Sequence, residues 1–376
     1  MSTKPLRIGV LTGGGDCPGI NAALRAVTKT LTLKYDAEVI GFLDGFQGLV
    51  DRNIESLHYR DVSGILTRGG TILGASNKAD PFNYQLRGGA DVSAQVVKTY
   101  RNLDLDALVA IGGDGTMSIA HRLTDLGIDI VGVPKTIDND LVGTDRTFGF
   151  DTAVSIATEA IDRIHTTAQS HHRIMIVETM GRYSGWIALH AGVASGADVI
   201  LIPEIEYEIE EVARVCLNRE RGGQRFTIIA VAEGAKRKDG DRVVQERSEE
   251  YTDSIRLGGI CRVLGDQLRE HLDSSIRTTV LGHMQRGGTP TAYDRNLATA
   301  FGTRAATLAA QGTTGVMVAV QNGTFTKVPL EEVADKTRTV PLDNSLLASG
   351  LEVGTSFGVE NPEVPATAPP TAQFQT

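Results

Sequence analysis

Short apolar runs recur along the chain, and each is followed by a glycine-rich or polar turn and then by a segment with helical spacing. Three such pairs of a run and its predicted helix lie at 8–12 and 21–33, 107–111 and 117–126, and 174–178 and 186–194. Further apolar runs follow at 226–232 and 278–281. Strands that are apolar throughout are typical of parallel sheets buried on both faces. The pattern predicts an α/β protein of mostly parallel sheets with helices on both faces, whose ligands bind at the carboxyl ends of the strands.

Two segments break this pattern. The charged stretch 236–250, KRKDGDRVVQERSEE, lies between an apolar run and a helix predicted from about residue 258, and we expect an exposed loop there. Near the end of the chain, four of the twelve prolines fall among Ala, Thr and Gln in the last fifteen residues. This composition predicts a disordered tail over 361–376.

Composition narrows the class of protein. A length of 376 residues favours two domains, and 37 Lys and Arg against 46 Asp and Glu give a net charge of −9. That balance argues against a nucleic acid or an anionic membrane as the main partner. Three widely spaced cysteines make a disulfide framework improbable. The first apolar run is too short for a signal peptide or a membrane span, so we expect a cytoplasmic protein.

The first strand leads into GGGDCPGIN, residues 13–21. Backbone N–H groups without side-chain obstruction, next to a helix start, suit a phosphate group, and Asn21 is a candidate cap for that helix. The segment matches neither the dinucleotide fingerprint GxGxxG nor the Walker pattern GxxxxGK[ST]. A plain turn and a phosphate site both remain open on this segment alone.

The second turn is GGDGT, residues 112–116, directly before a predicted helix. Asp114 would repel a phosphate by itself, but it becomes useful if it holds a magnesium ion against one. A strand, GGDGT and a helix together resemble three groups of kinases: phosphofructokinases, NAD kinases and diacylglycerol-type lipid kinases. The turn therefore indicates phosphoryl transfer without a Walker loop.

The third turn follows a strand that we expect to end at a proline, in PKTIDND, residues 134–140. Thr136, Asp138, Asn139 and Asp140 bring carboxylates close to Lys135. A general base for a sugar hydroxyl needs mainly to orient it, because phosphoryl transfer depends on positioning and charge stabilisation. An Asx-rich turn that caps the next helix is the alternative for this stretch alone.

Basic residues lie at predicted strand ends in the second half of the chain. They are Arg173, Arg182, Arg277, His283 and Arg286. A single arginine of this kind is usually part of a surface ion pair, but five such groups at strand ends form a candidate clamp for a phosphorylated substrate.

Six motifs, GGGDCPGIN, GGTILG, GGDGT, PKTIDND, MGRYSG and LGHMQRGG, occur in the order found in the phosphofructokinase family and span residues 7 to 302. On the evidence of these motifs the chain resembles the phosphofructokinase family, and in particular its branch that carries PKTIDND. The resemblance implies a two-domain phosphofructokinase fold. Residues 1–149 and 285–335 would form the domain for ATP and magnesium, and 150–284 and 336–360 the domain for fructose 6-phosphate.

The resemblance also implies roles for single residues in a 6-phosphofructokinase of glycolysis. Asp138 would be the base on the C1 hydroxyl, Thr136 and Arg182 would share the catalytic site, and Asp114 would bind Mg²⁺. The nucleotide would contact Gly14, Asn77, Lys78, Gly113, Asp114, Gly115 and Thr116. The sugar phosphate would contact Thr136, Ile137, Asp138, Arg173, Met180, Gly181, Arg182, Glu233, Arg277, His283, Met284, Gln285 and Arg286. Arg173 and Arg277 would reach in from a neighbouring subunit, which implies a homo-oligomer, a dimer or a tetramer.

Two residues bear on the phosphoryl donor. In the family, glycine at the position of Gly115 accompanies ATP, whereas lysine at the position of Lys135 is usual in pyrophosphate enzymes and also occurs in one ATP-using branch. Asn77 and Lys78 stand where bacterial ATP-dependent members commonly have an arginine. ATP is our prediction, with a pyrophosphate-dependent fructose 6-phosphate 1-phosphotransferase as the alternative. A silent regulatory subunit is disfavoured, because both Asp114 and Asp138 are present.

Overall fold

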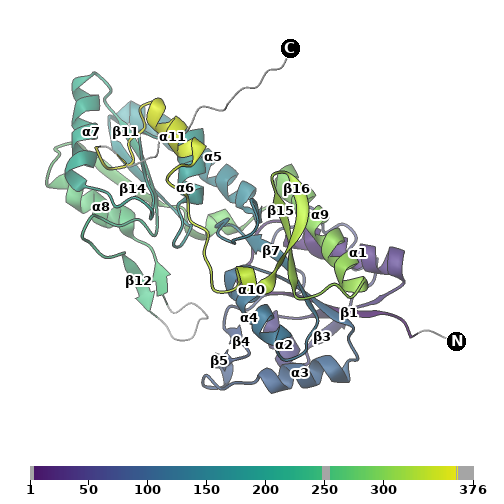
Figure 1. Cartoon of the computed structure of the whole chain (residues 1–376). Coiled ribbons are helices and arrows are strands. Elements are labelled where there is room, and N and C mark those ends of the chain that lie inside the picture. Colours follow the sequence, from purple (N-terminus) through teal and green to yellow (C-terminus); the bar gives the residue numbers. More distant parts are fainter. Residues whose placement is uncertain (1–3, 248–254, 361, 363–376) are drawn as a thin grey trace, which may run out of the picture. The chain divides into compact units, whose positions relative to one another are not determined.

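The computed structural model describes residues 4–247, 255–360 and 362. The chain forms two compact units. The first comprises residues 1–153, 246–256 and 283–338, and the second comprises 154–245, 257–282 and 339–376. Figure 1 shows the elements of each unit, coloured along the sequence. The predicted disordered tail, 361–376, lies outside the described residues except for Pro362.

The first unit is built on one large sheet with the strand order β16-β15-β7-β6-β1-β2-β3, and β8 pairs with β7. The strands from β15 to β2 are parallel, and β16 and β3 join antiparallel at the two edges. The strands of this sheet are β1 (Arg7–Thr12), β2 (Glu38–Phe42), β3 (Ile54–Ser56), β6 (Ala107–Gly112), β7 (Ile130–Thr136), β8 (Phe148–Gly149), β15 (Val316–Gln321) and β16 (Thr324–Pro329). A two-stranded sheet adds β4 (Ala79–Asp80) and β5 (Asn83–Tyr84).

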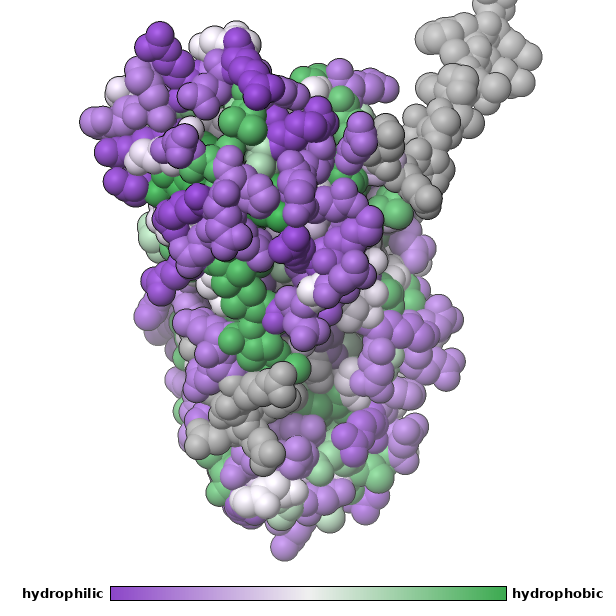
Figure 2. Space-filling model, turned by 90° about the vertical axis from the view of Figure 1, so that its left-hand side faces the viewer, coloured by the Kyte–Doolittle hydropathy of each residue, from purple (hydrophilic) through white to green (hydrophobic). Residues whose placement is uncertain are grey.

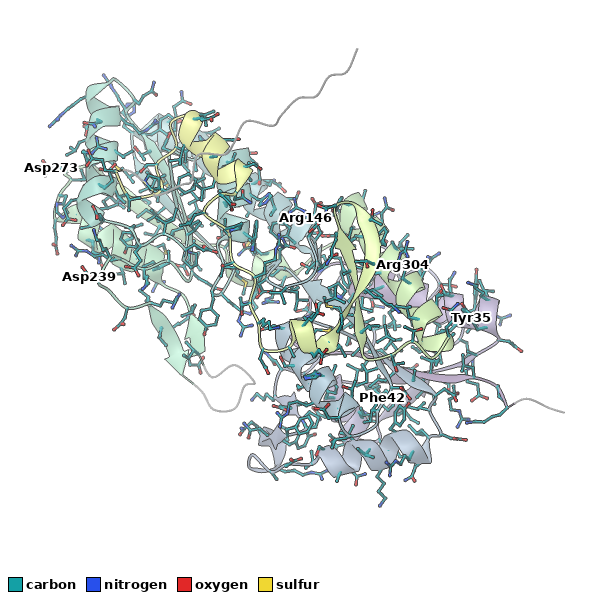
Figure 3. The ribbon with its side chains drawn as sticks, in the orientation of Figure 1. Tyr35, Phe42, Arg146, Asp239, Asp273 and Arg304 are labelled. Carbon is teal, nitrogen blue, oxygen red and sulfur yellow. The ribbon has the colours of Figure 1, made fainter. Side chains whose placement is uncertain are left out.

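Helices cover both faces of the first sheet, as the apolar strands predict. On one face α1 and α9 pack so closely that a Cβ on Gly302 would lie 2.6 Å from the Ala23 carbonyl oxygen. The other face carries a core of strand residues with α2, α3 and α4, and Phe42 lies within it (Figure 3). The helices of this unit are α1 (Ile20–Tyr35), α2 (Phe46–Asp51), η1 (Gln85–Arg87), α3 (Ser93–Asn102), α4 (Asp114–Thr124), η2 (Gly282–Arg286), α9 (Ala292–Ala310) and α10 (Leu330–Val333). The first residue of η2, Gly282, belongs to the second unit.

The second unit holds a smaller sheet, all parallel, in the order β10-β11-β9-β14. Its strands are β9 (Ile174–Thr179), β10 (Val199–Leu201), β11 (Thr227–Ala232) and β14 (Ile276–Val280). Helices α7 and α8 pack on one face, and α6 packs on alternate strand residues, Ile200 and Ala230. The helices are α6 (Trp186–Ala194), α7 (Ile209–Arg221), α8 (Ile260–Arg269) and α11 (Ser345–Glu352), and α5 (Phe150–His171) carries the chain in from the first unit. The predicted α/β class with mostly parallel sheets is confirmed.

Three local predictions are wrong. The charged stretch 236–250 is not only a loop, because β12 (Val244–Arg247) pairs with β13 (Ile255–Leu257). Gln245, Glu246 and Ile255 of this ribbon are exposed and Leu257 is buried, so the charged residues of the stretch did not exclude a strand there. The strand at PKTIDND continues past Pro134 to Thr136, with Pro134 paired against Gly112. Proline removes one donor from the ladder but does not end a strand when that N–H is not needed.

Asn21 is the third correction. Gly19 occupies the N-cap position of α1, and Asn21 lies fully buried inside the helix. Its Nδ2 donates to the carbonyl oxygens of Arg68 and Gly69 at 3.0 and 3.2 Å, and its Oδ1 accepts from the N–H of Ile72 at 2.9 Å. Asn21 therefore fixes the GGTILG loop rather than the helix end.

The surface of the molecule is mostly polar on the face that Figure 2 shows, with hydrophobic residues in small groups. Over the described ranges of the chain, no helix combines the length and the apolar character needed to cross a bilayer.

Candidate active site

Three of the predicted turns meet in the first unit. Strands β1, β6 and β7 are neighbours and run parallel, so their carboxyl ends lie at one edge of the sheet. The N–H of Gly13 donates to the carbonyl oxygen of Ile111 at 2.8 Å, and a Cβ on Gly13 would lie 2.6 Å from Thr116 Oγ1. A Cβ on Gly113 would lie 3.4 Å from the carbonyl oxygen of Lys135. GGGDCPGIN, GGDGT and PKTIDND therefore form one group of turns.

Lys135 lies buried at the centre of these turns. Its Nζ donates to the carbonyl oxygen of Gly15 at 2.5 Å, and a Cβ on Gly14 would lie 3.8 Å from it. Burial lowers the pKa of Lys135, and Arg286 acts in the same direction, whereas Asp114 and Asp138 favour its charged form. A positive charge here, within electrostatic range of both carboxylates, suits the charge of a phosphoryl group in transfer.

Asp138 sits in a turn that its neighbours hold tightly. Its N–H donates to Thr136 Oγ1 at 3.0 Å, and the hydroxyl of Thr136 also lies 3.3 Å from Asp138 Oδ2. Asn139 has a left-handed backbone, with φ of 52°, and its Oδ1 accepts from the N–H of Thr147 at 3.0 Å. Ile137 is fully buried beneath the turn. The position of the Asp138 carboxylate is thus set by hydrogen bonds between residues that are close in the sequence.

Asp114 and Gly115 belong to the first turn of α4, which begins three residues earlier than predicted. The N-terminus of a helix favours anions through its unsatisfied N–H groups and its dipole. A pocket of about 640 Å³ opens from here, and residues that the sequence analysis did not select complete it. Its lining is Asp80, Asp114, Gly115, Ser118, Ile119, Arg122, Asp335, Lys336 and Thr337.

Arg122 gives this pocket a flat cationic wall, because its guanidinium lies 3.6 Å from the centre of the Phe82 ring. Its place on α4, two turns after Asp114, is a signal that helical periodicity could have provided. Asn77 is exposed and Lys78 half-buried, directly before β4, and the Lys78 N–H lies 3.3 Å from Ser76 Oγ.

The residues of LGHMQRGG lie on and after η2. Arg286 Nη1 donates to the carbonyl oxygen of Asp16 at 3.2 Å, so it stands beside the first turn. Gln285 is fully buried, whereas His283 is exposed and Met284 is 69% exposed. Of these four predicted residues, the structure brings Arg286 to the group of turns around Lys135.

The second unit holds a separate group of predicted residues at the carboxyl ends of β9 and β11. Glu233 Oε1 accepts the N–H groups of Gly181 and Arg182 at 3.2 and 2.9 Å. Arg182 has a left-handed backbone with φ of 52°, and a Cβ on Gly234 would lie 1.9 Å from its carbonyl oxygen. Met180 is half-buried at the start of this turn. Glu233 therefore shapes the MGR turn, in addition to any contact with a ligand.

Arg173 and Arg277 do not join that group. Arg173 precedes β9, and Arg277 is the second residue of β14, so both lie at the amino ends of neighbouring parallel strands. Six residues of strand separate Arg173 from the turn with Arg182, which corresponds to roughly 20 Å. Arg173 and Arg277 therefore lie at the edge of the sheet where its strands begin, whereas Arg182 and Glu233 lie at the edge where the strands end.

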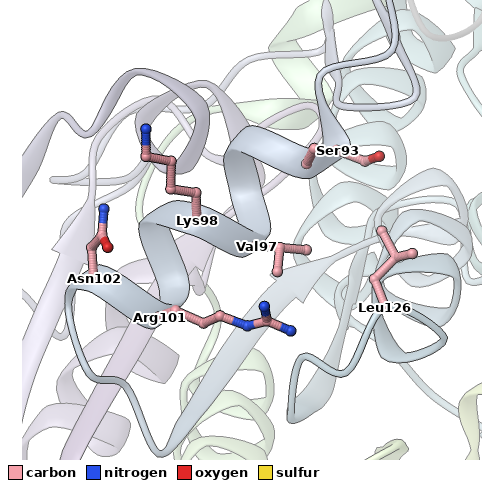
Figure 4. Close-up of a pocket in the computed structure, with 7 residues that line it drawn as sticks. Ser93, Val97, Lys98, Arg101, Asn102 and Leu126 are labelled. Carbon is pink, nitrogen blue, oxygen red and sulfur yellow. The ribbon is translucent and has the colours of Figure 1, made fainter.

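A second pocket, of about 490 Å³, runs along α3 and contains none of the predicted residues. Figure 4 shows Val97 and Arg101 of α3 on its wall opposite Leu126. It lacks the glycine turns and carboxylates of the pocket at α4.

Comparisons with known proteins identify the family of this chain. The family model for phosphofructokinase matches residues 7–309. An ATP-dependent 6-phosphofructokinase 2 of Clostridium perfringens is 49% identical over 358 residues, covering 93% of this chain and 98% of the relative. A pyrophosphate–fructose 6-phosphate 1-phosphotransferase of Amycolatopsis mediterranei is 50% identical over 339 residues, covering 90% and 97%. The crystal structure of Pichia pastoris phosphofructokinase in the T-state superimposes with a TM-score of 0.77 at 31% identity, covering 94% of this chain and 37% of that one. The predicted family is confirmed, and the chain belongs to the phosphofructokinase family.

Proposed function

We propose that the protein is an ATP-dependent 6-phosphofructokinase, which transfers a phosphoryl group from ATP to the C1 hydroxyl of fructose 6-phosphate. The Clostridium perfringens relative carries this name. The observation that carries the choice of donor is the pocket beside Asp114 and Gly115, whose 640 Å³ extends past the phosphate-binding turns to Arg122 and Lys336. A pocket of this size suits the nucleoside of ATP. Pyrophosphate has no nucleoside and would leave this space unused.

The alternative donor is pyrophosphate, which the name of the Amycolatopsis relative includes. The observation that favours it is the burial of the Lys135 amine among the turns, where it can neutralise a leaving phosphate. Lys135 serves the β-phosphate of either donor, however, while only ATP uses the space beyond Gly115. The pocket therefore outweighs the lysine.

The chemistry assigns distinct roles to the three turns. Asp138 orients the sugar hydroxyl and accepts its proton, and the buried Lys135 amine stabilises negative charge on the transferred group. Thr136 holds Asp138 through the bonds described above and faces the same edge of the sheet. The N–H groups at Gly14 and at the start of α4 hold the donor phosphates.

A magnesium ion would bind at Asp114. Within residues 4–247 and 255–360, no three His, Cys, Asp or Glu side chains gather as a metal-binding group. One carboxylate at the edge of a phosphate site still fits Mg²⁺, which usually binds through one or two carboxylates together with substrate phosphates and water. When bound, the ion neutralises charge on the donor phosphates.

The sugar phosphate is assigned to the second unit and to η2. Met180, Gly181, Arg182 and Glu233 would bind the sugar. Because Arg173 and Arg277 lie at the far edge of their own sheet, we assign them, with His283 and Arg286, to the 6-phosphate of a site shared between subunits of a homo-oligomer. Mixing Arg173→Ala protein with Asp138→Asn protein should then restore activity in hybrid oligomers. No restored activity after proven subunit exchange would contradict the shared site.

The proposed donor is tested in a coupled assay of the purified protein with fructose 6-phosphate, Mg²⁺ and either ATP or pyrophosphate. We expect ATP to be used and pyrophosphate to give little activity. Gly115→Asp should lower kcat/KM for ATP about 30-fold, because half of a ~4 kcal/mol repulsion between unit charges at ~4 Å is about 2 kcal/mol. Activity of the same variant with pyrophosphate is the control and should fall much less. A wild type that prefers pyrophosphate would overturn the donor assignment.

A further inference from the structure

Arg338, the last residue of the first unit, contacts the loop that carries Asp138. Its Nη1 donates to the carbonyl oxygens of both Asn139 and Asp145 at 3.1 Å. Its own backbone N–H donates to the carbonyl oxygen of Asp140 at 2.7 Å. One residue thus joins the two ends of the segment 139–145 and also fixes a point within it.

The two halves of this loop are held differently. Its outer half is tied to the end of β15, since the N–H of Asp145 donates to the Val320 carbonyl oxygen at 2.8 Å and the N–H of Val320 donates to Thr144 Oγ1 at 3.1 Å. Its inner half, next to Asp138, turns through the left-handed Asn139. The guanidinium of Arg338 lies on the carbonyl group of this residue and so fixes the direction in which the chain leaves Asp138.

Charge reinforces this contact. Arg338 is half-buried, and burial is the main cause that lowers its pKa, with Arg146 acting in the same direction and Asp145 and Asp140 opposing them. The two carboxylates of the loop and the guanidinium of Arg146 are therefore within electrostatic range of Arg338. Charged hydrogen bonds of this kind are stronger than neutral ones.

We propose that Arg338 is a positioning residue for the base Asp138, a role that rests on the proposed function. It acts by fixing the backbone on the C-terminal side of Asp138, while Thr136 fixes the N-terminal side. No glycine motif accompanies TRTV, the segment that holds Arg338, so no pattern along the chain selects it.

The test uses Arg338→Met, which keeps a long unbranched stem and the backbone N–H but removes the guanidinium. We expect kcat to fall about 10- to 100-fold, because a misplacement of about 1 Å costs up to 10²-fold, while KM for both substrates changes less than about threefold. Arg338→Lys, which retains the charge and can serve one of the two carbonyl oxygens, should recover part of the lost kcat. Millimolar guanidinium should restore activity to Arg338→Ala.

Arg7→Met is the matched control. Arg7 donates to the carbonyl oxygen of Leu103 at 2.8 Å from the amino end of β1, at the edge of the sheet away from the turns. It should lower stability without changing kcat.

Hydrogen exchange gives a readout that needs no activity. In Arg338→Met the amides of Asp138 and Thr147 should exchange at least about tenfold faster than in the wild type, and in Arg7→Met they should not. Unchanged exchange in Arg338→Met, or an unchanged kcat in the folded variant, would overturn the positioning role. A wild type inactive with both donors would instead overturn the proposed function, and exchange alone would then decide on Arg338.

Discussion

Two turns that carry proposed site residues hold a left-handed residue in different ways. The turn after β7 in the first unit contains Asn139, and the turn after β9 in the second contains Arg182, and both residues have a left-handed backbone with φ of 52°. Asn139 is held by its own side chain, which accepts from Thr147 eight residues further on. Arg182 is held by Glu233, fifty-one residues away, through its backbone N–H.

The difference separates local from distant support. Asparagine adopts the left-handed region readily because its short polar side chain bonds to nearby backbone, whereas arginine gains nothing of that kind. The strain at Arg182 is therefore imposed from outside, by a carboxylate and by the close approach of Gly234 to the Arg182 carbonyl group. We expect Asn139 to keep its left-handed backbone through its own side chain, with Arg338 fixing the carbonyl groups of the loop, and Arg182 to depend for its backbone on residues distant in the sequence.

The largest expected effect concerns Asp138, the proposed base in the first turn. Asp138→Asn keeps the shape of the side chain and its place beside Thr136 but removes the proton acceptor. Because general-base catalysis typically contributes 10²- to 10⁴-fold, kcat should fall by that factor with little change in KM for fructose 6-phosphate. Steady-state kinetics with both substrates varied measure this. A variant with full kcat would show that the first turn is only a structural element.

A smaller effect is expected from the support of the second turn. Glu233→Ala removes the acceptor for two N–H groups, and each bond to a charged group is worth about 1.5–3 kcal/mol. KM for fructose 6-phosphate should rise roughly 10- to 100-fold, with kcat changed much less, because we propose that this turn holds the sugar and that the base lies elsewhere.

Glu233→Gln is the matched variant for that prediction. Its amide oxygen can still accept from Gly181 and Arg182, so KM should stay within about fivefold of the wild type. Equal damage in the Gln and Ala variants would mean that the charge of Glu233, and not its support of the turn, is what matters.

The same contrast explains how far the sequence could be interpreted. The strands, the helices that follow them and the polar turns at residues 112–116 and 134–140 were predictable, because apolar runs, glycines and Asx residues act over a few positions. The family motifs extended this to MGRYSG. The opposite placement of Arg173 and Arg182 was also available from the sequence, since one precedes the apolar run of β9 and the other follows it.

Contacts between distant segments could not be predicted in this way. Nothing near Asn21 indicates that it binds the backbone of residues 68–72 instead of capping its own helix. Arg338 and Lys336 lie in a polar stretch without periodicity, and only the fold brings them to the loop of Asp138 and the pocket at α4. Such residues act through tertiary structure, which a pattern along the chain does not encode.

The smallest expected effect compares the two left-handed residues directly by replacing each with glycine, which adopts this backbone freely. Asn139→Gly removes the strain but also the bond to Thr147, so the free energy of unfolding of the first unit should fall by about 1–2 kcal/mol. Arg182→Gly leaves the bond from its N–H to Glu233 in place. Relief of the roughly 1–2 kcal/mol of strain is partly offset by the greater freedom of glycine in the unfolded chain.

For Arg182→Gly, the free energy of unfolding of the second unit should therefore stay unchanged or rise by up to about 1 kcal/mol, even though the proposed contact with the sugar is removed with the side chain. Trp186, the single tryptophan of the chain, is buried in the second unit, so its fluorescence in a urea titration reports that unit. Hydrogen exchange of the β6 amides reports the first unit. A loss of stability at Arg182 equal to that at Asn139 would mean that the arginine side chain supports its own turn, and the distinction between local and distant support would fail.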